Sequence, residues 1–87
     1  MPRLSSFYGI VIAMYWSEPH HSVPHFHAYY GEYEASLDFA GEILAGDLPK
    51  RQLRLVQAWV ELHADELEAD WARAASEQPL MPIPPLQ

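Results

Sequence analysis

The 87-residue sequence predicts one α+β domain, in which three to four antiparallel strands pack against one long C-terminal helix. The first half of the chain contains short runs rich in β-branched and aromatic residues, separated by Gly and Pro turns. The second half keeps apolar residues at spacings of three and four, without Gly or Pro, until Pro79. A proline-rich extended tail follows at residues 78–87, so the domain itself is expected to span residues 1–77.

The composition predicts a soluble, cytoplasmic protein with an ordinary apolar core. Apolar residues make up 49% of the chain and aromatic residues 13%, which suffices for a core without disulfides or a structural metal. Cysteine is absent, which excludes thiol catalysis and thiolate zinc sites. No signal peptide is apparent, and the longest apolar run is half of the roughly 20 residues that a membrane-spanning helix needs. A net charge of −7 disfavours general nucleic-acid binding.

The strands are predicted from their patterns and from the turns between them. Residues 7–16 are apolar at both parities and indicate a central strand covered on both faces. After a proline-containing loop, residues 25–30 and 33–39 form a predicted hairpin around a two-residue turn at Gly31 and Glu32. Residues 41–46 are expected to form either a short fourth edge strand or a loop, because glycine stands at both ends.

The predicted turn fixes the register of the hairpin. One face is apolar and pairs Tyr30 with Tyr33, Ala28 with Ala35, and Phe26 with Leu37. The other face is polar and pairs Tyr29 with Glu34, His27 with Ser36, and His25 with Asp38.

The helix is expected to run from about residue 49 to 76, with Asp47 as its N-cap and Pro49 in its first turn. At 1.5 Å per residue it would be roughly 42 Å long, longer than a compact domain of this size is wide. We therefore expect a bend near residues 63–65, or a far end that packs on something else. His63 lies in the apolar stripe, where a structural role is expected.

Four of the five histidines, His20, His21, His25 and His27, lie within eight residues. Imidazole is a frequent transition-metal ligand and titrates near neutral pH, so these residues suggest either a divalent-metal site or acid–base chemistry. A solvated polar strand is the third interpretation. Asp38, opposite His25, is a candidate to orient that ring, which makes His25, His27 and Asp38 the candidate catalytic residues.

Two charged segments suggest partners. Lys50, Arg51 and Arg54, at the predicted helix N-terminus, are candidate anion-binding residues that would hold a phosphate during metal-independent RNA cleavage by the two histidines. Residues 61–70 are strongly acidic, as is typical of a solvated helix face or of a docking face for a basic partner.

Several segments together resemble a bacterial family, the domain-of-unknown-function family 4160. They are Phe7-Tyr8-Gly9-Ile10, Pro24-His25-Phe26-His27-Ala28, Tyr30-Gly31-Glu32-Tyr33-Glu34-Ala35, Gly41-Glu42-Ile43-Leu44 and Gly46-Asp47-Leu48-Pro49, followed by helix positions that include Trp59, Leu62-His63 and Trp71. The resemblance covers nearly the whole chain except the tail. It implies a small protein encoded beside a second small protein, in what look like toxin–antitoxin-type pairs.

Three functions are therefore carried forward. The leading hypothesis is a protein-binding member of such a pair, whose partner is the cognate small protein of the same operon, with a homodimer as a further possibility. The apolar segment 7–16 and the apolar tail favour it, because such surfaces need cover. The second is a metal-independent ribonuclease, for which RNA is the partner. The third is divalent-metal binding by the four clustered histidines; no other cofactor is expected.

Overall fold

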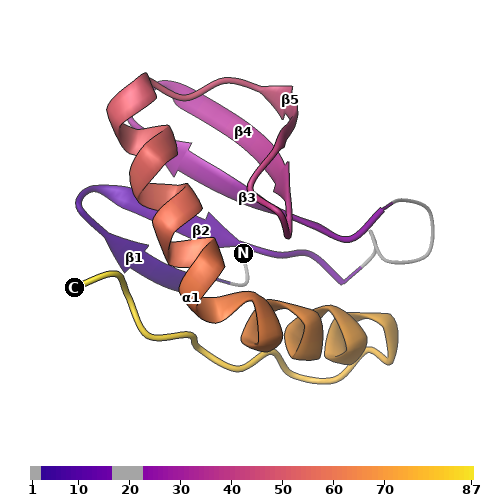
Figure 1. Cartoon of the computed structure of the whole chain (residues 1–87). Coiled ribbons are helices and arrows are strands. Elements are labelled where there is room, and N and C mark those ends of the chain that lie inside the picture. Colours follow the sequence, from indigo (N-terminus) through magenta and orange to yellow (C-terminus); the bar gives the residue numbers. More distant parts are fainter. Residues whose placement is uncertain (1–2, 17–22) are drawn as a thin grey trace.

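The computed structural model describes residues 3–16 and 23–87. Over these residues the chain forms five strands and one long helix, which confirms the predicted α+β class. The strands are β1 (Arg3–Phe7), β2 (Ile10–Ala13), β3 (His25–Tyr30), β4 (Tyr33–Asp38) and β5 (Ile43–Gly46). They form one antiparallel sheet in the order β1-β2-β3-β4-β5, so that each strand pairs with its neighbours in sequence (Figure 1).

The first hairpin differs from the sequence prediction. A single central strand over residues 7–16 is wrong, because the chain reverses at Tyr8 and Gly9, and Phe7 pairs with Ile10. Both turn residues have positive φ, 50° and 79°, which is the backbone pattern of a type I′ turn. Tyrosine rarely adopts this conformation, so Gly9 was the one residue of this turn that signalled it in the sequence. This extra hairpin raises the strand number above the predicted three to four.

The second hairpin matches its prediction throughout. Gly31, with φ +56°, occupies the first central position of the turn. All six predicted pairs are present, from Tyr30 opposite Tyr33 to His25 opposite Asp38. The apolar members of these pairs, Phe26, Ala28, Ala35 and Leu37, are buried in the core.

Residues 41–46, for which the sequence allowed either a strand or a loop, contain an edge strand. β5 pairs with β4 through a bulge at Leu44 and ends at Gly46. Gly46 has φ +76°, and a Cβ at this position would lie 2.1 Å from the Glu34 carbonyl oxygen. Only glycine therefore fits where the chain leaves the sheet toward the helix.

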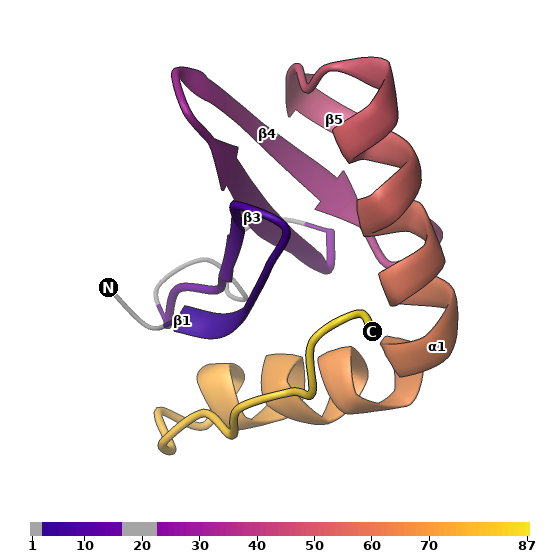
Figure 2. The same ribbon diagram turned by 90° about the vertical axis from the view of Figure 1, so that its left-hand side faces the viewer.

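The helix α1 (Lys50–Ala75) bends where the sequence suggested. His63 has non-helical dihedrals, φ −126° and ψ 22°. The first half of α1 lies against one face of the sheet, and the second half turns beneath it (Figure 2). His63 is largely buried, hydrogen-bonds Glu66 and lies 5.7 Å from the Trp59 ring between centroids, in agreement with its predicted structural role.

The predicted N-cap of the helix is wrong. Pro49 occupies the N-cap position and makes no side-chain hydrogen bond there. Asp47 lies two residues earlier, where its Oδ1 accepts a hydrogen bond from the backbone N–H of Leu48. Proline has a fixed φ that fits the backbone at this position. Its side chain has no hydrogen-bond acceptor, so the helix starts without a side-chain cap.

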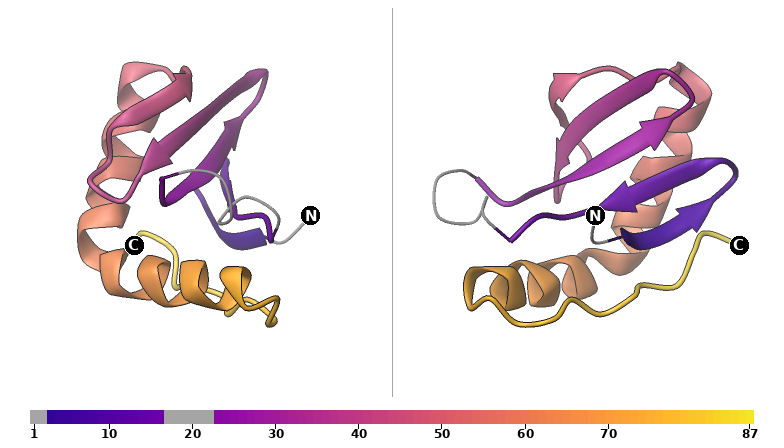
Figure 3. Two further views of the ribbon diagram at one scale, coloured as in Figure 1. Left: turned by 90° about the vertical axis from the view of Figure 1, so that its right-hand side faces the viewer. Right: turned by 180° about the vertical axis from the view of Figure 1, so that it is seen from behind.

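The proline-rich segment, residues 78–87, contains no helix or strand and runs back along the second half of α1 to β1 (Figure 3). Ile83 is 3% exposed, and its backbone N–H donates to the Leu4 carbonyl oxygen at 2.8 Å. Ile83 and the buried residues of 7–16 therefore belong to the chain's own core, whereas Tyr8, Trp16 and Met81 in the same two segments stay 59%, 40% and 55% exposed.

Candidate functional site

His25 and His27 project from the same side of β3, within a row of aromatic rings. The two imidazole centroids are 5.2 Å apart. Trp71, from the second half of α1, lies 5.4 Å from His25. Tyr15 lies edge-on to His27 at 5.0 Å, and its hydroxyl shares a 2.6 Å hydrogen bond with that of Tyr29. The predicted gathering of ionisable rings on one sheet face is therefore present.

One hydrogen bond of His25 goes to the backbone and not to Asp38. The ring is 7% exposed, and its Nδ1 lies 2.8 Å from the Val23 carbonyl oxygen. Because a carbonyl oxygen only accepts, Nδ1 carries the proton and Val23 sets the tautomer. Asp38 stands opposite His25, but its Oδ1 accepts the backbone N–H groups of Ala40 and Glu42, each at 2.9 Å. This carboxylate oxygen orders the turn before β5, and the orienting role of Asp38 toward His25 stays a prediction.

The predicted anion-binding residues lie away from the histidines. Lys50, Arg51 and Arg54 are exposed at the start of α1, soon after β5 ends opposite Ala35. His25 stands opposite Asp38, three residues further along β4, or about 10 Å at the usual rise of a strand. The first half of α1 packs through Trp59 on the sheet face that carries Phe26, whereas His25 projects from the other face and contacts Trp71 of the second half. The anion-binding role of Lys50, Arg51 and Arg54 stays a prediction.

Two of the four histidines of the predicted metal site, His25 and His27, are among the described residues. His20 and His21 lie outside the described residues. Among residues 3–16 and 23–87 there is no group of three or more His, Asp or Glu side chains placed to hold a metal ion. Metal binding by His20, His21, His25 and His27 thus stays a prediction.

Sequence reasoning missed a hollow near the start of β3. Its volume is about 560 Å³, and it is lined by Val23, Pro24, Asp38, Phe39, Ala40, Leu44 and Glu68. A second hollow of about 380 Å³ shares Phe39 and Ala40 with it and extends along α1 to Gln57, Val60, Glu61 and Ala64. We call the two together the apolar hollow. Its signal in the sequence was Val23, which precedes Pro24, and Leu44, which lies in the short segment between Gly41 and Gly46.

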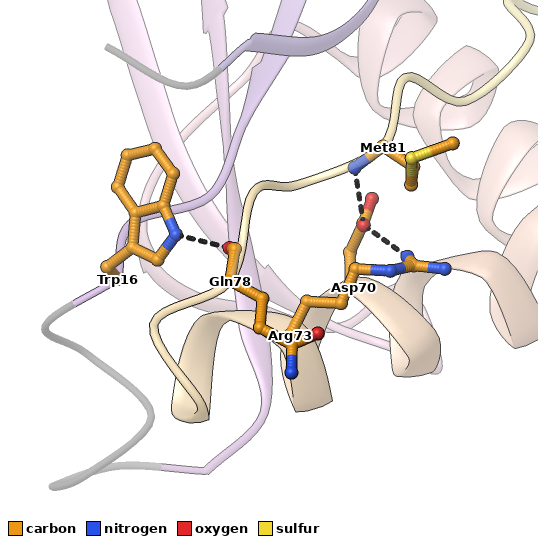
Figure 4. Close-up of polar contacts among 5 residues, drawn as sticks. All are labelled: Trp16, Asp70, Arg73, Gln78 and Met81. Atoms are coloured by element: carbon orange, nitrogen blue, oxygen red, sulfur yellow. Dashed lines mark hydrogen bonds and ion pairs between the residues drawn. The ribbon is translucent and has the colours of Figure 1, made fainter.

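A buried carboxylate was also missed. The acidic run was interpreted as a solvated face, and this is wrong for Asp70, which is fully buried. Its Oδ1 accepts hydrogen bonds from Arg73 at 2.6 Å and from the backbone N–H of Met81 at 2.8 Å (Figure 4). Its Oδ2 is buried and has no hydrogen-bond partner within the part of the chain that the structure describes. Close by, the Trp16 indole donates to the Gln78 carbonyl oxygen at 2.8 Å.

A family model described as a domain of unknown function, DUF4160, matches residues 9–72, well over half of the chain. The chain belongs to the DUF4160 family. This confirms the family to which the sequence is similar, and no activity is known for it. No curated protein matches the chain, and no solved structure does. The DUF4160 match includes the histidines of β3, Trp59 and Asp70, and it ends before the proline-rich segment.

Within residues 3–16 and 23–87, no helix is both long and apolar enough to cross a bilayer.

Proposed function

We propose that this DUF4160 protein is a protein-binding module, and that its partner is a small basic protein, the cognate product of the same operon in a toxin–antitoxin-type pair. The observation that carries the proposal is the apolar hollow. Val23 is 58% exposed and Leu44 46% exposed on its wall, although both are large apolar residues. A partner side chain seated there would remove this apolar surface from water.

The gain from such burial is of the size that anchors an interface. Fully burying a Val or Leu side chain contributes about 1.5–3 kcal/mol. A few anchors of this kind dominate most interfaces, while the surrounding contacts exclude water. Val23 and Leu44 are thus suited to receive one apolar anchor of a partner.

Charge defines the chemistry of that partner. Glu61 and Glu68 are exposed on the helix side of the hollow, and no Lys or Arg is among the described residues that line it. The chain as a whole carries a net charge of −7. Complementarity then favours a partner with basic residues around its anchor and speeds their encounter. Two copies of this chain would repel at the same surface, so a homodimer through the hollow is disfavoured.

The two other hypotheses have less support. The ribonuclease needs a cation near the histidines, and the end of β5, four residues before Lys50, is separated from the His25 position by about 10 Å along β4. The metal site depends on His20 and His21, which lie outside the described residues.

The test is binding to the product of the neighbouring gene, measured by size exclusion with light scattering and by calorimetry. The wild-type chain is expected to form a stable heterocomplex. Leu44→Lys places a charge in the hollow and should weaken binding at least tenfold. Leu62→Lys is the matched control, because Leu62 is 69% exposed on α1 and does not line the hollow.

The possible outcomes test the proposed partner and the proposed surface separately. A monomer that forms no heterocomplex with the neighbouring product at low or high salt contradicts the proposed partner. Equal weakening by Leu44→Lys and Leu62→Lys contradicts the proposed surface. Glu68→Lys should lower the affinity mainly at low salt, because its contribution is electrostatic and is screened by ions.

A further inference from the structure

The proline-rich segment lies in a groove on a different surface from the apolar hollow. We call the surface that holds residues 80–86 the segment groove; it is formed by Trp59, Asp70 and the edge of β1 at Leu4. The Trp59 indole N–H donates to the Pro84 carbonyl oxygen at 2.9 Å. Asp70 accepts the Met81 N–H, and the Leu4 carbonyl oxygen accepts the Ile83 N–H.

All three hydrogen bonds go to the backbone of the segment. The groove therefore recognises the extended backbone of the segment and restricts few of its side chains. Strand addition and aromatic grooves that bind proline-rich peptides work in the same way. Specificity comes from one anchor, Ile83, which is buried, while Leu80 and Leu86 pack at its sides. Met81 stays 55% exposed. The groove thus selects an extended segment with a central apolar residue.

The prolines suit the segment to this role. Pro82, Pro84 and Pro85 fix φ near the extended value, so little conformational freedom is lost on docking. The two N–H groups that the groove uses belong to Met81 and Ile83, which are not prolines. A segment of this kind binds as a preorganised ligand.

The groove and its occupant belong to different parts of the chain. Trp59 and Asp70 lie inside the DUF4160 match at residues 9–72, whereas residues 80–86 lie outside it. The chain's own segment also leaves a polar atom of the groove unused. Asp70 Oδ2 is buried and has no hydrogen-bond partner among residues 3–16 and 23–87, and it lies beside a hollow of about 210 Å³ lined in part by Arg73, Met81 and Pro82. Another segment that supplies a donor there would satisfy the groove better.

We propose that the segment groove is a recognition site for an extended, proline-containing apolar segment of a partner protein, and that residues 80–86 are the occupant the chain supplies to itself. A tethered segment competes at an effective concentration of roughly millimolar. Since residues 80–86 are docked, the same segment added as a free peptide should bind the emptied groove with a dissociation constant below about 1 mM.

The test uses the full chain with the variant Ile83→Asp, which removes the anchor and keeps the length. A synthetic peptide of residues 78–87 is then titrated in, and the Trp59 indole N–H resonance is followed by NMR. We expect saturable shifts of this resonance in the variant and none in the wild-type chain, whose groove is occupied. The matched control is the same peptide carrying Ile83→Asp, which should not bind.

Folding of the variant does not limit the experiment. If Ile83→Asp unfolds the chain, recovery of the folded spectrum on adding the peptide supports the proposal, and no recovery at several millimolar peptide overturns it. Equal binding to wild type and variant, or equal binding of the control peptide, also overturns it. A concentration-dependent dimer of the wild-type chain in light scattering would assign the groove to a second copy's segment instead of a partner's.

Discussion

The Asp70 side chain accepts a hydrogen bond from the backbone N–H of Met81, eleven residues later in the chain, at 2.8 Å. The same oxygen accepts one from Arg73 at 2.6 Å, so one carboxylate joins the last turns of α1 to the proline-rich segment. One partner of this ion pair is fully buried. Removing one member of such a pair costs more stability than the intact pair contributes, because the remaining groups are left desolvated and unpaired.

Asp70→Ala should therefore lower the free energy of unfolding by about 2–3 kcal/mol, since it removes both hydrogen bonds. Asp70→Asn keeps a carbonyl oxygen that can accept the Met81 N–H and should cost about half as much. Urea denaturation followed by circular dichroism measures both. If Asp70→Ala is as stable as wild type, Asp70 does not hold the segment.

Two glycines of similar backbone conformation should respond differently to alanine. Gly31 (φ +56°) has no atom within 4 Å of an added Cβ, whereas at Gly46 (φ +76°) that Cβ meets the Glu34 carbonyl oxygen. Gly31→Ala should cost about 1–2 kcal/mol, the usual penalty of left-handed backbone. Gly46→Ala adds overpacking and should cost roughly 2–5 kcal/mol. Similar melting temperatures for the two variants would contradict the close approach at Gly46.

One substitution should stabilise the chain. The end of α1 has the hydrogen bonds of a Schellman motif, from the Gln78 N–H to the Arg73 carbonyl and from the Glu77 N–H to the Ala74 carbonyl. The position that glycine usually occupies is Glu77, with φ +56°. Glu77→Gly should relieve this strain and raise stability by about 0.5–1 kcal/mol, and Glu77→Ala, the matched control, should not. Thermal unfolding of the two variants distinguishes them.

The two histidines of β3 should contribute unequally to stability. His25 is buried, packs on Trp71 and donates to the Val23 carbonyl oxygen, so His25→Ala should cost about 2–3 kcal/mol. His27 is only partly buried, and His27→Ala should cost about 1 kcal/mol or less. Urea midpoints that fall equally for both variants would contradict this ranking.

The chain is also expected to leave RNA intact. The net charge of −7 repels the phosphates of RNA and so disfavours its binding. Incubation of the purified protein with single-stranded RNA, with His27→Ala as the control, checks this expectation. Cleavage by wild type that the control lacks would restore the ribonuclease hypothesis.

The sequence was sufficient for features that depend on local patterns. Gly31 and Glu32 between two alternating runs determined the hairpin register in full, and the length of the apolar stripe indicated the bend at His63. The turn at Tyr8 was missed because tyrosine carries no preference for positive φ. There, tertiary packing of Phe7 and Ile10 outweighs the local cost.

The site was less predictable, since its contacts come from residues distant in sequence. The alternation along β3 predicts that His25 and His27 share a face, but their partners, Trp71 and the Val23 carbonyl, depend on the fold. Asp70 stands among exposed acids, and only the return of Met81 explains its burial. The apolar hollow likewise combines turn residues with α1, which no local pattern describes.

The bend at His63 also sets the angular phase between the two halves of α1. Each residue of an α-helix turns by about 100°, so deleting one residue at the bend would rotate every later side chain by that amount. Leu67 and Ala74 would then leave the interior, and the carboxylate at position 70 would face water. We therefore expect insertions and deletions at this point to be tolerated far less than those in the exposed turn at Gly31.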